Sequence, residues 1–304
     1  MKPHRKDVLN VRFPALAGVA LALSGIFLLP SKDLAQNVTM SNGGSTATLN
    51  LGGGTGNIGM NSWTVLGGQN QLDQQWFWYS VNGAPQQSID NISAATVYNY
   101  SIPASPIDDL GVVYQNSQLS VEIEYLLTGN GVSSGSADIM EYLSVVNKGA
   151  SPISLSFYQY SNFNLFQNNM NSVNISGGPG AYNGAVQTTS GAGSDGIAEV
   201  IDAPYADFAE AATTFQTLNQ LNSGSYYDLN DTTAAGPGDV TWAFEWTATL
   251  QPFGTVDQYG NHLDTLDITK DKGLSIQIVP EPSTAAFIGM GLSVLGLMLR
   301  RRAS

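Results

Sequence analysis

Residues 240–250, VTWAFEWTATL, decide the fold of this chain. Apolar side chains occupy every even position of the stretch, whereas threonine, alanine and glutamate occupy the odd positions. Alternation with a period of two is typical of a β-strand that buries one face, because successive side chains point to opposite sides of a sheet. The stretch therefore predicts a strand with Trp242, Phe244 and Trp246 in the core and Glu245 on the opposite face.

The same alternation recurs on both sides of this strand. Further predicted strands that share it are 97–102, 119–127, 139–146, 153–160 and 274–278. Turns rich in glycine and asparagine separate them, and Asn82-Gly83 predicts a hairpin between residues 76–81 and 86–89. Parallel strands would require crossover helices, which the pattern lacks. The sequence therefore predicts an all-β fold, an antiparallel β-sandwich.

One amphipathic helix is expected at residues 204–222, covering an edge or an end of the sandwich. Apolar residues recur there at spacings of three and four: Tyr205, Phe208, Ala212, Phe215, Leu218 and Leu221. Asp202 is placed to cap its start, Pro204 lies in the first turn and Gly224 follows its end. A glycine-rich segment at 36–61, nearly free of charge, is either a flexible leader or an edge strand interrupted by glycines.

The first 35 residues have the composition of a signal peptide. Four basic residues, Lys2, Arg5, Lys6 and Arg12, precede an apolar helix at 15–29, which is short for a permanent membrane span. Cleavage is expected after Ala35, and the alternative is an uncleaved signal anchor. Residues 36–279 then form the exported domain.

The C-terminal residues 279–304 combine three features in a fixed order. Val279-Pro280-Glu281-Pro282 is followed by an apolar run at 285–299 and then by Arg300, Arg301 and Arg302. The prolines hold the backbone extended. As a transmembrane helix the apolar run spans only about 22 Å, with the arginines on the cytoplasmic side as a stop-transfer signal. The alternative is an ordinary tail anchor.

This tail resembles the sorting segment of the PEP-CTERM family of exported bacterial proteins. The resemblance implies that secretion machinery exports the chain and that the C-terminal helix holds it in the inner membrane, facing the periplasm. An exosortase would then cut near Pro280-Glu281-Pro282 and pass the domain to the cell surface or to an extracellular matrix of exopolysaccharide. Residues 75–79, 87–90 and 238–244 also resemble stretches of uncharacterised PEP-CTERM proteins.

The composition excludes several classes of function. Residues 36–279 contain three lysines, no arginine and 21 acids, a net charge of 3 minus 21, or −18. Such a domain repels phosphate backbones, so no nucleic-acid partner is expected. The absence of cysteine excludes thiolate chemistry. His262 is the sole histidine after the signal peptide. A multi-histidine metal site is therefore excluded, and a Ser-His-Asp triad is not expected without a substitute base.

Four groups of residues are candidates for binding or catalysis. Ca²⁺ is the one cofactor considered, because it is bound by oxygen ligands alone. Its first candidate ligands are Asp228, Asn230 and Asp231, and a second cluster contains Asp257, Asn261, Asp264 and Asp267. Ordinary Asx turns explain both clusters equally well.

The remaining candidates are carboxylates and aromatic side chains. Glu122, Glu124 and Glu141 are expected on one face of neighbouring strands, as a catalytic trio or as exposed charge. Trp76 and Trp78 lie in the run 76–79, where two aromatic side chains face outward and stack on glycans unless both faces of the strand are buried.

The function expected from the sequence is that of an exported, non-enzymatic protein of the cell surface or extracellular matrix, carrying a signal for exosortase. The alternative is a glycan-binding module or a carboxylate-dependent glycan hydrolase displayed by the same tail.

Overall fold

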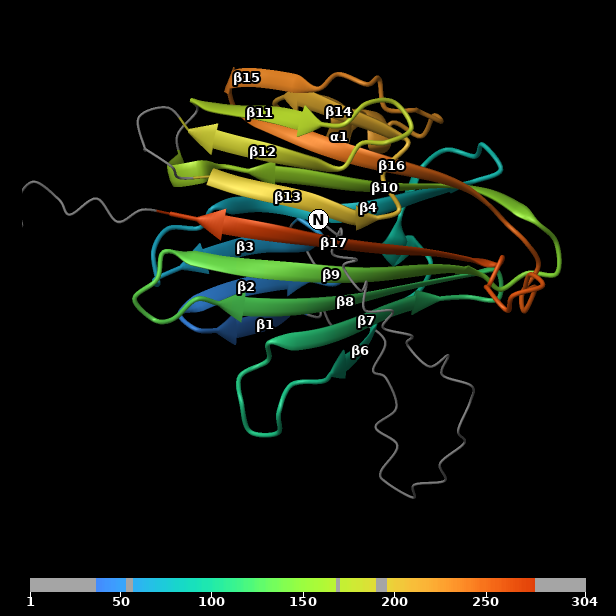
Figure 1. Ribbon diagram of the computed structural model, residues 1–304, viewed down its shortest axis with the longest axis horizontal. Coiled ribbons are helices and arrows are strands. Elements are labelled where there is room, and N and C mark those ends of the chain that lie inside the picture. The colour runs from blue at the N-terminus through green and yellow to red at the C-terminus, as the bar shows by residue number, and fades with distance from the viewer. Residues whose placement is uncertain (1–36, 53–56, 168–169, 190–195, 277–304) are drawn as a thin grey trace, which may run out of the picture. The chain divides into compact units, whose positions relative to one another are not determined.

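The computed structural model describes residues 37–52, 57–167, 170–189 and 196–276, which form two antiparallel sheets (Figure 1). The eight-stranded sheet contains β1 (Asn37–Asn42), β2 (Ser45–Asn50), β3 (Gly59–Val65), β4 (Leu72–Val81), β5 (Gln87–Ser88), β10 (Ile153–Phe163), β14 (Phe208–Thr213) and β16 (Val240–Leu250). Its strand order is β1-β2-β3-β4-β10-β16-β14, with β5 paired to β4.

The nine-stranded sheet faces the viewer in Figure 1. It contains β6 (Thr96–Asn99), β7 (Asp109–Gln115), β8 (Leu119–Gly129), β9 (Ser136–Asn147), β11 (Asn171–Ser176), β12 (Gly184–Thr189), β13 (Gly196–Ala203), β15 (Ala234–Gly238) and β17 (Thr265–Ser275). Its order is β15-β11-β12-β13-β17-β9-β8-β7-β6. The remaining elements are η1 (Ile89–Asn91), η2 (Leu165–Gln167) and α1 (Gln216–Leu221). The predicted all-β antiparallel sandwich is confirmed.

The core lies between the two sheets and is dominated by aromatic rings. Phe163 stacks on Trp242 at a centroid distance of 5.4 Å, and Phe77 stacks on Phe157 at 5.7 Å. All four side chains are buried. The strand predicted at 240–250 coincides with β16, so the alternation identified the side that enters the core.

Most predicted strands are confirmed, and one is displaced. The strand expected at 274–278 runs instead from Thr265 to Ser275. Lys270 and Lys272 point to its buried face and interrupt the apolar alternation that a sequence pattern relies on. The hairpin at Asn82-Gly83 is confirmed, and both residues have the positive φ, 55° and 72°, that a tight type I′ turn requires.

The helix predicted at 204–222 is wrong for most of its length. Residues 208–213 form strand β14, which pairs with β16, and only α1 at 216–221 is helical. The apolar residues have helical spacing, but β16 offers a free edge next to them. Backbone pairing along that edge satisfies the peptide groups of β14, and this tertiary contact outweighs the local pattern.

The glycine-rich segment forms strands and not a flexible leader over residues 37–52. β1 and β2 pair as a hairpin whose turn residues, Gly43 and Gly44, have positive φ. A side chain on Gly43 would place its Cβ 2.3 Å from the carbonyl oxygen of Gly129. The predicted signal peptide at 1–35 and the segment 279–304 lie outside the described residues. Among the described residues, no helix is long and apolar enough to cross a membrane.

Candidate functional site

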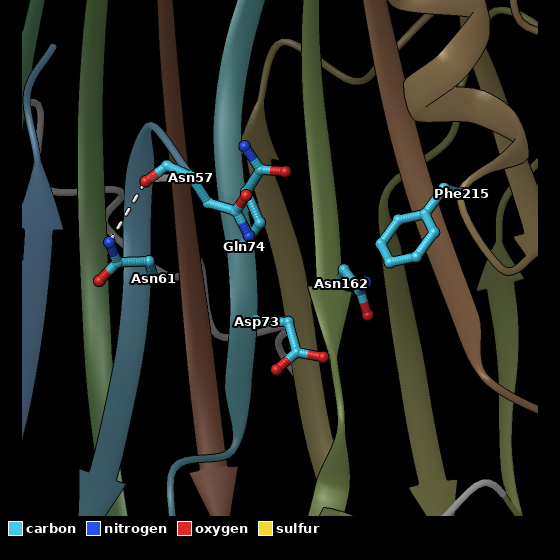
Figure 2. A pocket seen from close by; sticks show the side chains of 6 residues that line it. All are labelled: Asn57, Asn61, Asp73, Gln74, Asn162 and Phe215. Carbon is cyan, nitrogen blue, oxygen red and sulfur yellow. Dashed lines mark hydrogen bonds between the residues drawn. The ribbon is translucent and has the colours of Figure 1, made fainter. Parts of the chain in front are cut away.

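A pocket of about 410 Å³ opens on the face of the eight-stranded sheet that points away from the other sheet. Figure 2 shows its six lining residues, which we call the Phe215 pocket: Asn57, Asn61, Asp73, Gln74, Asn162 and Phe215. The volume falls within the range of about 300–1,000 Å³ that is usual for small-molecule sites.

The strand register explains why these side chains converge. Gln74 on β4 lies opposite Asn162 on β10, and paired residues of antiparallel strands point to the same face. Their neighbour Gln75 points the other way, toward the nine-stranded sheet, where it approaches Glu141. A β-bulge follows Asn162 and ends the regular pairing at the pocket.

Local hydrogen bonds hold the remaining wall. The Gln74 side chain donates to the carbonyl oxygen of Ile58 at 2.9 Å, and the Asn61 amide donates to the carbonyl oxygen of Asn57 at 3.2 Å. Figure 2 shows the second of these bonds, and it shows the ring of Phe215 across the pocket from Asn57 and Asn61. Phe215 comes from the segment that leads into α1.

The pocket combines polar groups with one aromatic ring. Gln74 and Asn162 are 8% and 1% exposed, whereas Phe215 is 46% exposed. Burial and the charge of Asp239 raise the pKa of Asp73 above its usual value, although a hydrogen bond from Asn164 opposes the shift. Amide and carboxylate groups bind hydroxyl groups, and an exposed ring stacks on apolar faces. The pocket therefore has the chemistry to hold a polyol such as a sugar.

Next to the pocket, the segment 215–233 covers the same face of the sheet. Glu210 accepts hydrogen bonds from Thr217 at 2.6 Å and from the hydroxyl group of Tyr227, and Glu245 accepts one from the backbone N–H of Leu229 at 3.1 Å. Both carboxylates are buried. Their hydrogen bonds hold the segment 215–233 on the sheet, and their burial keeps them out of contact with a ligand.

Trp76 and Trp78 do not form the predicted stacking surface. They are 1% and 2% exposed, so the prediction of glycan stacking on these rings is wrong. Trp76 donates its indole N–H to Ser88 at 2.7 Å, and Trp78 donates to Asn222, in the covering segment, at 3.1 Å. Both faces of β4 are buried, which accounts for a continuous aromatic run.

The candidate calcium ligands are occupied by local hydrogen bonds. Asp228 accepts from the hydroxyl group of Tyr226 at 2.5 Å, Asn230 accepts from the N–H of Thr232 at 3.0 Å, and Asp231 accepts from the N–H of Ala209 at 3.5 Å. In the part of the chain that is described, no group of three or more histidines or acids is arranged to hold a metal ion. Calcium binding at Asp228, Asn230 and Asp231 stays a prediction.

The second acidic cluster is also explained by turns. Asp257 accepts from the N–H groups of Tyr259 at 2.7 Å and Asn261 at 2.9 Å, which is an Asx turn. Asp264 is buried and accepts from the N–H of Gly254 at 2.6 Å, and His262 lies 3.1 Å from the same carboxylate.

The trio of Glu122, Glu124 and Glu141 does not share one face. Tyr125 lies opposite Glu141, so Glu124 points to the opposite side of the nine-stranded sheet. Glu141 is completely buried between the sheets, where it contacts Lys270 and Lys272. The prediction of a carboxylate trio is therefore wrong.

The sequence pattern was not interpreted as a buried ionic cluster, although the alternation of apolar residues in β9 and β17 indicates one. Within 136–147, Glu141 occupies the same parity as Ala137, Ile139, Leu143 and Val145. The same rule applied to β17 places two of the three lysines of the exported domain on the face of Ile268 and Leu274. A charged residue at an apolar position of a strand pattern predicts a buried ion pair.

The C-terminal tail matches a described family. Residues 279–302 match the PEP-CTERM protein-sorting motif. This chain carries a PEP-CTERM sorting signal. The PEP-CTERM motif marks the chain as an exported protein with an exosortase as its processing partner, and it contains the predicted residues Val279 to Pro282 and Arg300 to Arg302.

The sandwich is similar in fold to solved structures. A bacterial glucoamylase complexed with acarbose matches with a TM-score of 0.51 and 10% identity, over 86% of this chain and 36% of the glucoamylase. The likeness shows a shared fold alone. A putative aldose 1-epimerase from Escherichia coli K12 matches with a TM-score of 0.44 and 11% identity, over 80% of this chain and 99% of that one. No curated protein matches this chain.

Proposed function

We propose that this PEP-CTERM protein is a non-enzymatic component of the cell surface or extracellular matrix, and that its β-sandwich binds a neutral glycan in the Phe215 pocket. Before processing, the C-terminal helix anchors the protein in the inner membrane with the sandwich in the periplasm. The exosortase then cuts the chain at Pro280-Glu281-Pro282, and the domain joins the exopolysaccharide outside the cell.

The composition of the pocket carries the proposal for a glycan. Five amide or carboxylate side chains surround one half-exposed ring, which matches the mixture of hydroxyl groups and apolar faces on a sugar. Residues 36–279 have a net charge of −18, so negatively charged polysaccharides are repelled. A neutral glycan is the class that remains.

The same pocket supports binding in preference to hydrolysis. Asp73 is the one carboxylate among its six lining residues, whereas glycosidases use two acids about 5–10 Å apart. Asp239 is the second candidate acid, since its charge raises the pKa of Asp73. A glycan hydrolase built on Asp73 and Asp239 is the second candidate function.

Affinity electrophoresis of the exported protein through gels that contain neutral polysaccharides tests the binding site. The wild-type protein should be retarded, and Phe215→Ala should weaken binding about tenfold, because a stacked ring contributes about 1.5 kcal/mol. Phe253→Ala removes a ring that is 56% exposed, on a different loop, and should bind like the wild type. Equal retardation of Phe215→Ala and wild type would refute the site, and release of reducing ends would favour the hydrolase.

The sorting half of the proposal has its own test. Replacing Pro280, Glu281 and Pro282 together by alanine should leave a larger product retained in the membrane of a host that encodes an exosortase. Equal electrophoretic mobility of the variant and the wild type would rule out processing at this motif.

A further inference from the structure

Four charged side chains form a closed cluster in the core between the two sheets: Glu141 on β9, Glu199 on β13, and Lys270 and Lys272 on β17. All four are completely buried. β17 lies between β13 and β9, and Figure 1 shows the three strands side by side. The register places Lys270 directly opposite Glu141 and Lys272 directly opposite Glu199.

Burial makes this arrangement costly as long as all four groups are charged. Two carboxylates and two ammonium groups are removed from water, and each loses its hydration. The ring of Phe77 lies 5.1 Å from the Lys270 ammonium, so the surroundings of this lysine are apolar on one side. Burial, together with the charge of Lys272, lowers the pKa of Lys270 to about 8, which brings the neutral amine within reach.

The contacts give each group of the cluster a different role. The Lys270 amine touches Oε2 of Glu141 directly. Lys272 donates to the other oxygen, Oε1, at 3.0 Å. Glu199 lies with its Oε1 3.4 Å from the Lys270 nitrogen, and the indole of Trp242 and the amide of Gln159 hold its carboxylate in place at 2.7 Å each. The Lys270 amine is thus a nucleophile in contact with the carboxyl group of Glu141, the electrophile. Lys272 is a hydrogen-bond donor to the carboxyl oxygen, and Glu199 is a proton acceptor.

We propose that Lys270 and Glu141 condense after folding to form an intramolecular amide bond that links β17 to β9. The Lys270 Nζ attacks Cδ of Glu141, and Lys272 stabilises the negative charge that develops on Oε1. Before the attack, one proton of the Lys270 ammonium passes directly to Oε2, which Nζ contacts, and leaves a neutral amine. During the attack Glu199 accepts a second proton from Nζ and returns it to the Oε2 hydroxyl group. Oε2 then leaves as water, so the Nζ–Cδ bond forms, the Cδ–Oε2 bond breaks, and one ammonium and one carboxylate become one amide and one water.

The reaction is balanced without an oxidant, a reductant or a second substrate. Two groups held in contact react with effective molarities of about 10⁵–10⁸ M, which offsets the unfavourable equilibrium of amide formation between separate molecules in water. The product removes two buried charges and leaves Lys272 paired with Glu199, 3.2 Å apart, so the core stays neutral.

A covalent link at this place suits the rest of the chain. The exported domain contains no cysteine, so disulfides are unavailable to it outside the cell. The two residues are 129 positions apart and lie on the central strand of the nine-stranded sheet, β17, and on its neighbour β9. The amide would therefore close residues 141–270, about half of the domain, into one covalent loop.

Peptide mapping of the exported wild-type protein tests the proposal. The protein is denatured, digested with trypsin and then with chymotrypsin, and the peptides are sequenced by mass spectrometry. The expected product joins the peptide of Glu141 to the peptide of Lys270 and is lighter than their sum by one water molecule. Trypsin should also fail to cut after Lys270, although it cuts after Lys148.

Variants and a time course assign the roles. Lys270→Arg should abolish the linked peptide, whereas Lys148→Arg, at a half-buried lysine outside the cluster, and Glu124→Gln, on the outer face of the neighbouring strand, should retain it. Lys272→Met should slow its formation about 10²-fold, the usual effect of removing one donor to a developing oxyanion. Recovery of the Glu141 and Lys270 peptides as separate, unmodified species from wild-type protein after prolonged storage at pH 8 would overturn the proposal, whatever the variants do.

Discussion

The indole nitrogen of Trp242 lies 2.7 Å from Oε2 of Glu199, and this hydrogen bond crosses the core from one sheet to the other. Trp242 belongs to β16 of the eight-stranded sheet, and Glu199 belongs to β13 of the nine-stranded sheet. Both side chains are buried. β16, the apolar strand that decides the fold, is therefore hydrogen-bonded to the ionic cluster in the core.

Replacement of Trp242 by phenylalanine should destabilise the domain. The ring volume is largely kept, but the donor to a buried carboxylate is lost, and a hydrogen bond to a charged group contributes about 1.5–3 kcal/mol. The free energy of unfolding in urea measures the loss. Trp246→Phe is the matched control: its indole donates to the carbonyl oxygen of Pro204, a neutral acceptor, so its cost should be nearer 1 kcal/mol. An equal cost for both variants would contradict the role given to Glu199.

Removal of Lys272 alone should destabilise the domain more than removal of Lys272 together with Glu199. Lys272→Met leaves the buried carboxylate of Glu199 without the cation that lies 3.2 Å from it, and breaking a buried ion pair costs about 3–5 kcal/mol. The double variant Glu199→Gln with Lys272→Met restores the charge balance and should recover part of the loss. The free energy of unfolding in urea, measured for the single and the double variant, checks this order. A double variant that is less stable than Lys272→Met would contradict it.

The stability of the domain should depend on pH through Glu245. Burial, followed by the charge of Asp228, raises the pKa of this carboxyl group to about 7 in the folded protein, whereas its ordinary value is 4.5. The folded state therefore holds the proton more tightly than the unfolded state. The stabilisation is present in full below pH 4.5 and is lost as the pH rises to 7, a change of about 3 kcal/mol.

Glu245→Gln isolates this contribution, because the variant keeps the shape of the side chain and does not titrate. The difference in unfolding free energy between wild type and variant should shift in favour of the variant between pH 4.5 and pH 7. Parallel pH profiles for the two proteins would mean that Glu245 titrates normally.

Gly43 should be intolerant of a side chain. In Gly43→Ala the new Cβ meets the backbone oxygen of Gly129 at 2.3 Å, and φ is +51°, so the hairpin of β1 and β2 must move away from β8. Gly180→Ala is the control, since it has a φ of +78° with open space around the new Cβ, and it should cost only about 1–2 kcal/mol. Thermal unfolding of the two variants compares the costs, and similar melting temperatures would contradict the close contact.

Strands with one buried face were predictable, and the exceptions have a common cause. The alternation identified β16 because its core face is purely apolar. It misplaced the strand that contains Lys270 and Lys272, because these lysines point into the core, where they pair with Glu141 and Glu199. β14 was mistaken for part of a helix because the free edge of β16, which decides its conformation, is distant in sequence.

The candidate site was less predictable than the fold. Trp76 and Trp78 have the composition of a glycan surface, but Asn222 of the segment 215–233 contacts Trp78, and Ser88 and Tyr114 contact Trp76. No local pattern shows that residues so distant in sequence will cover these rings. The Phe215 pocket brings together residues that are separated by up to 158 positions, and its asparagines and glutamine are common in the chain. Only the sorting motif is contiguous, and it was recognisable for that reason.

Intact mass spectrometry of the protein recovered from the surface of cells that encode an exosortase tests the central claim most directly. The account predicts a chain that has lost its signal peptide and ends at or before Pro282, without the arginines at 300–302. A full-length chain found in the cytosol, with those arginines still attached, would contradict it.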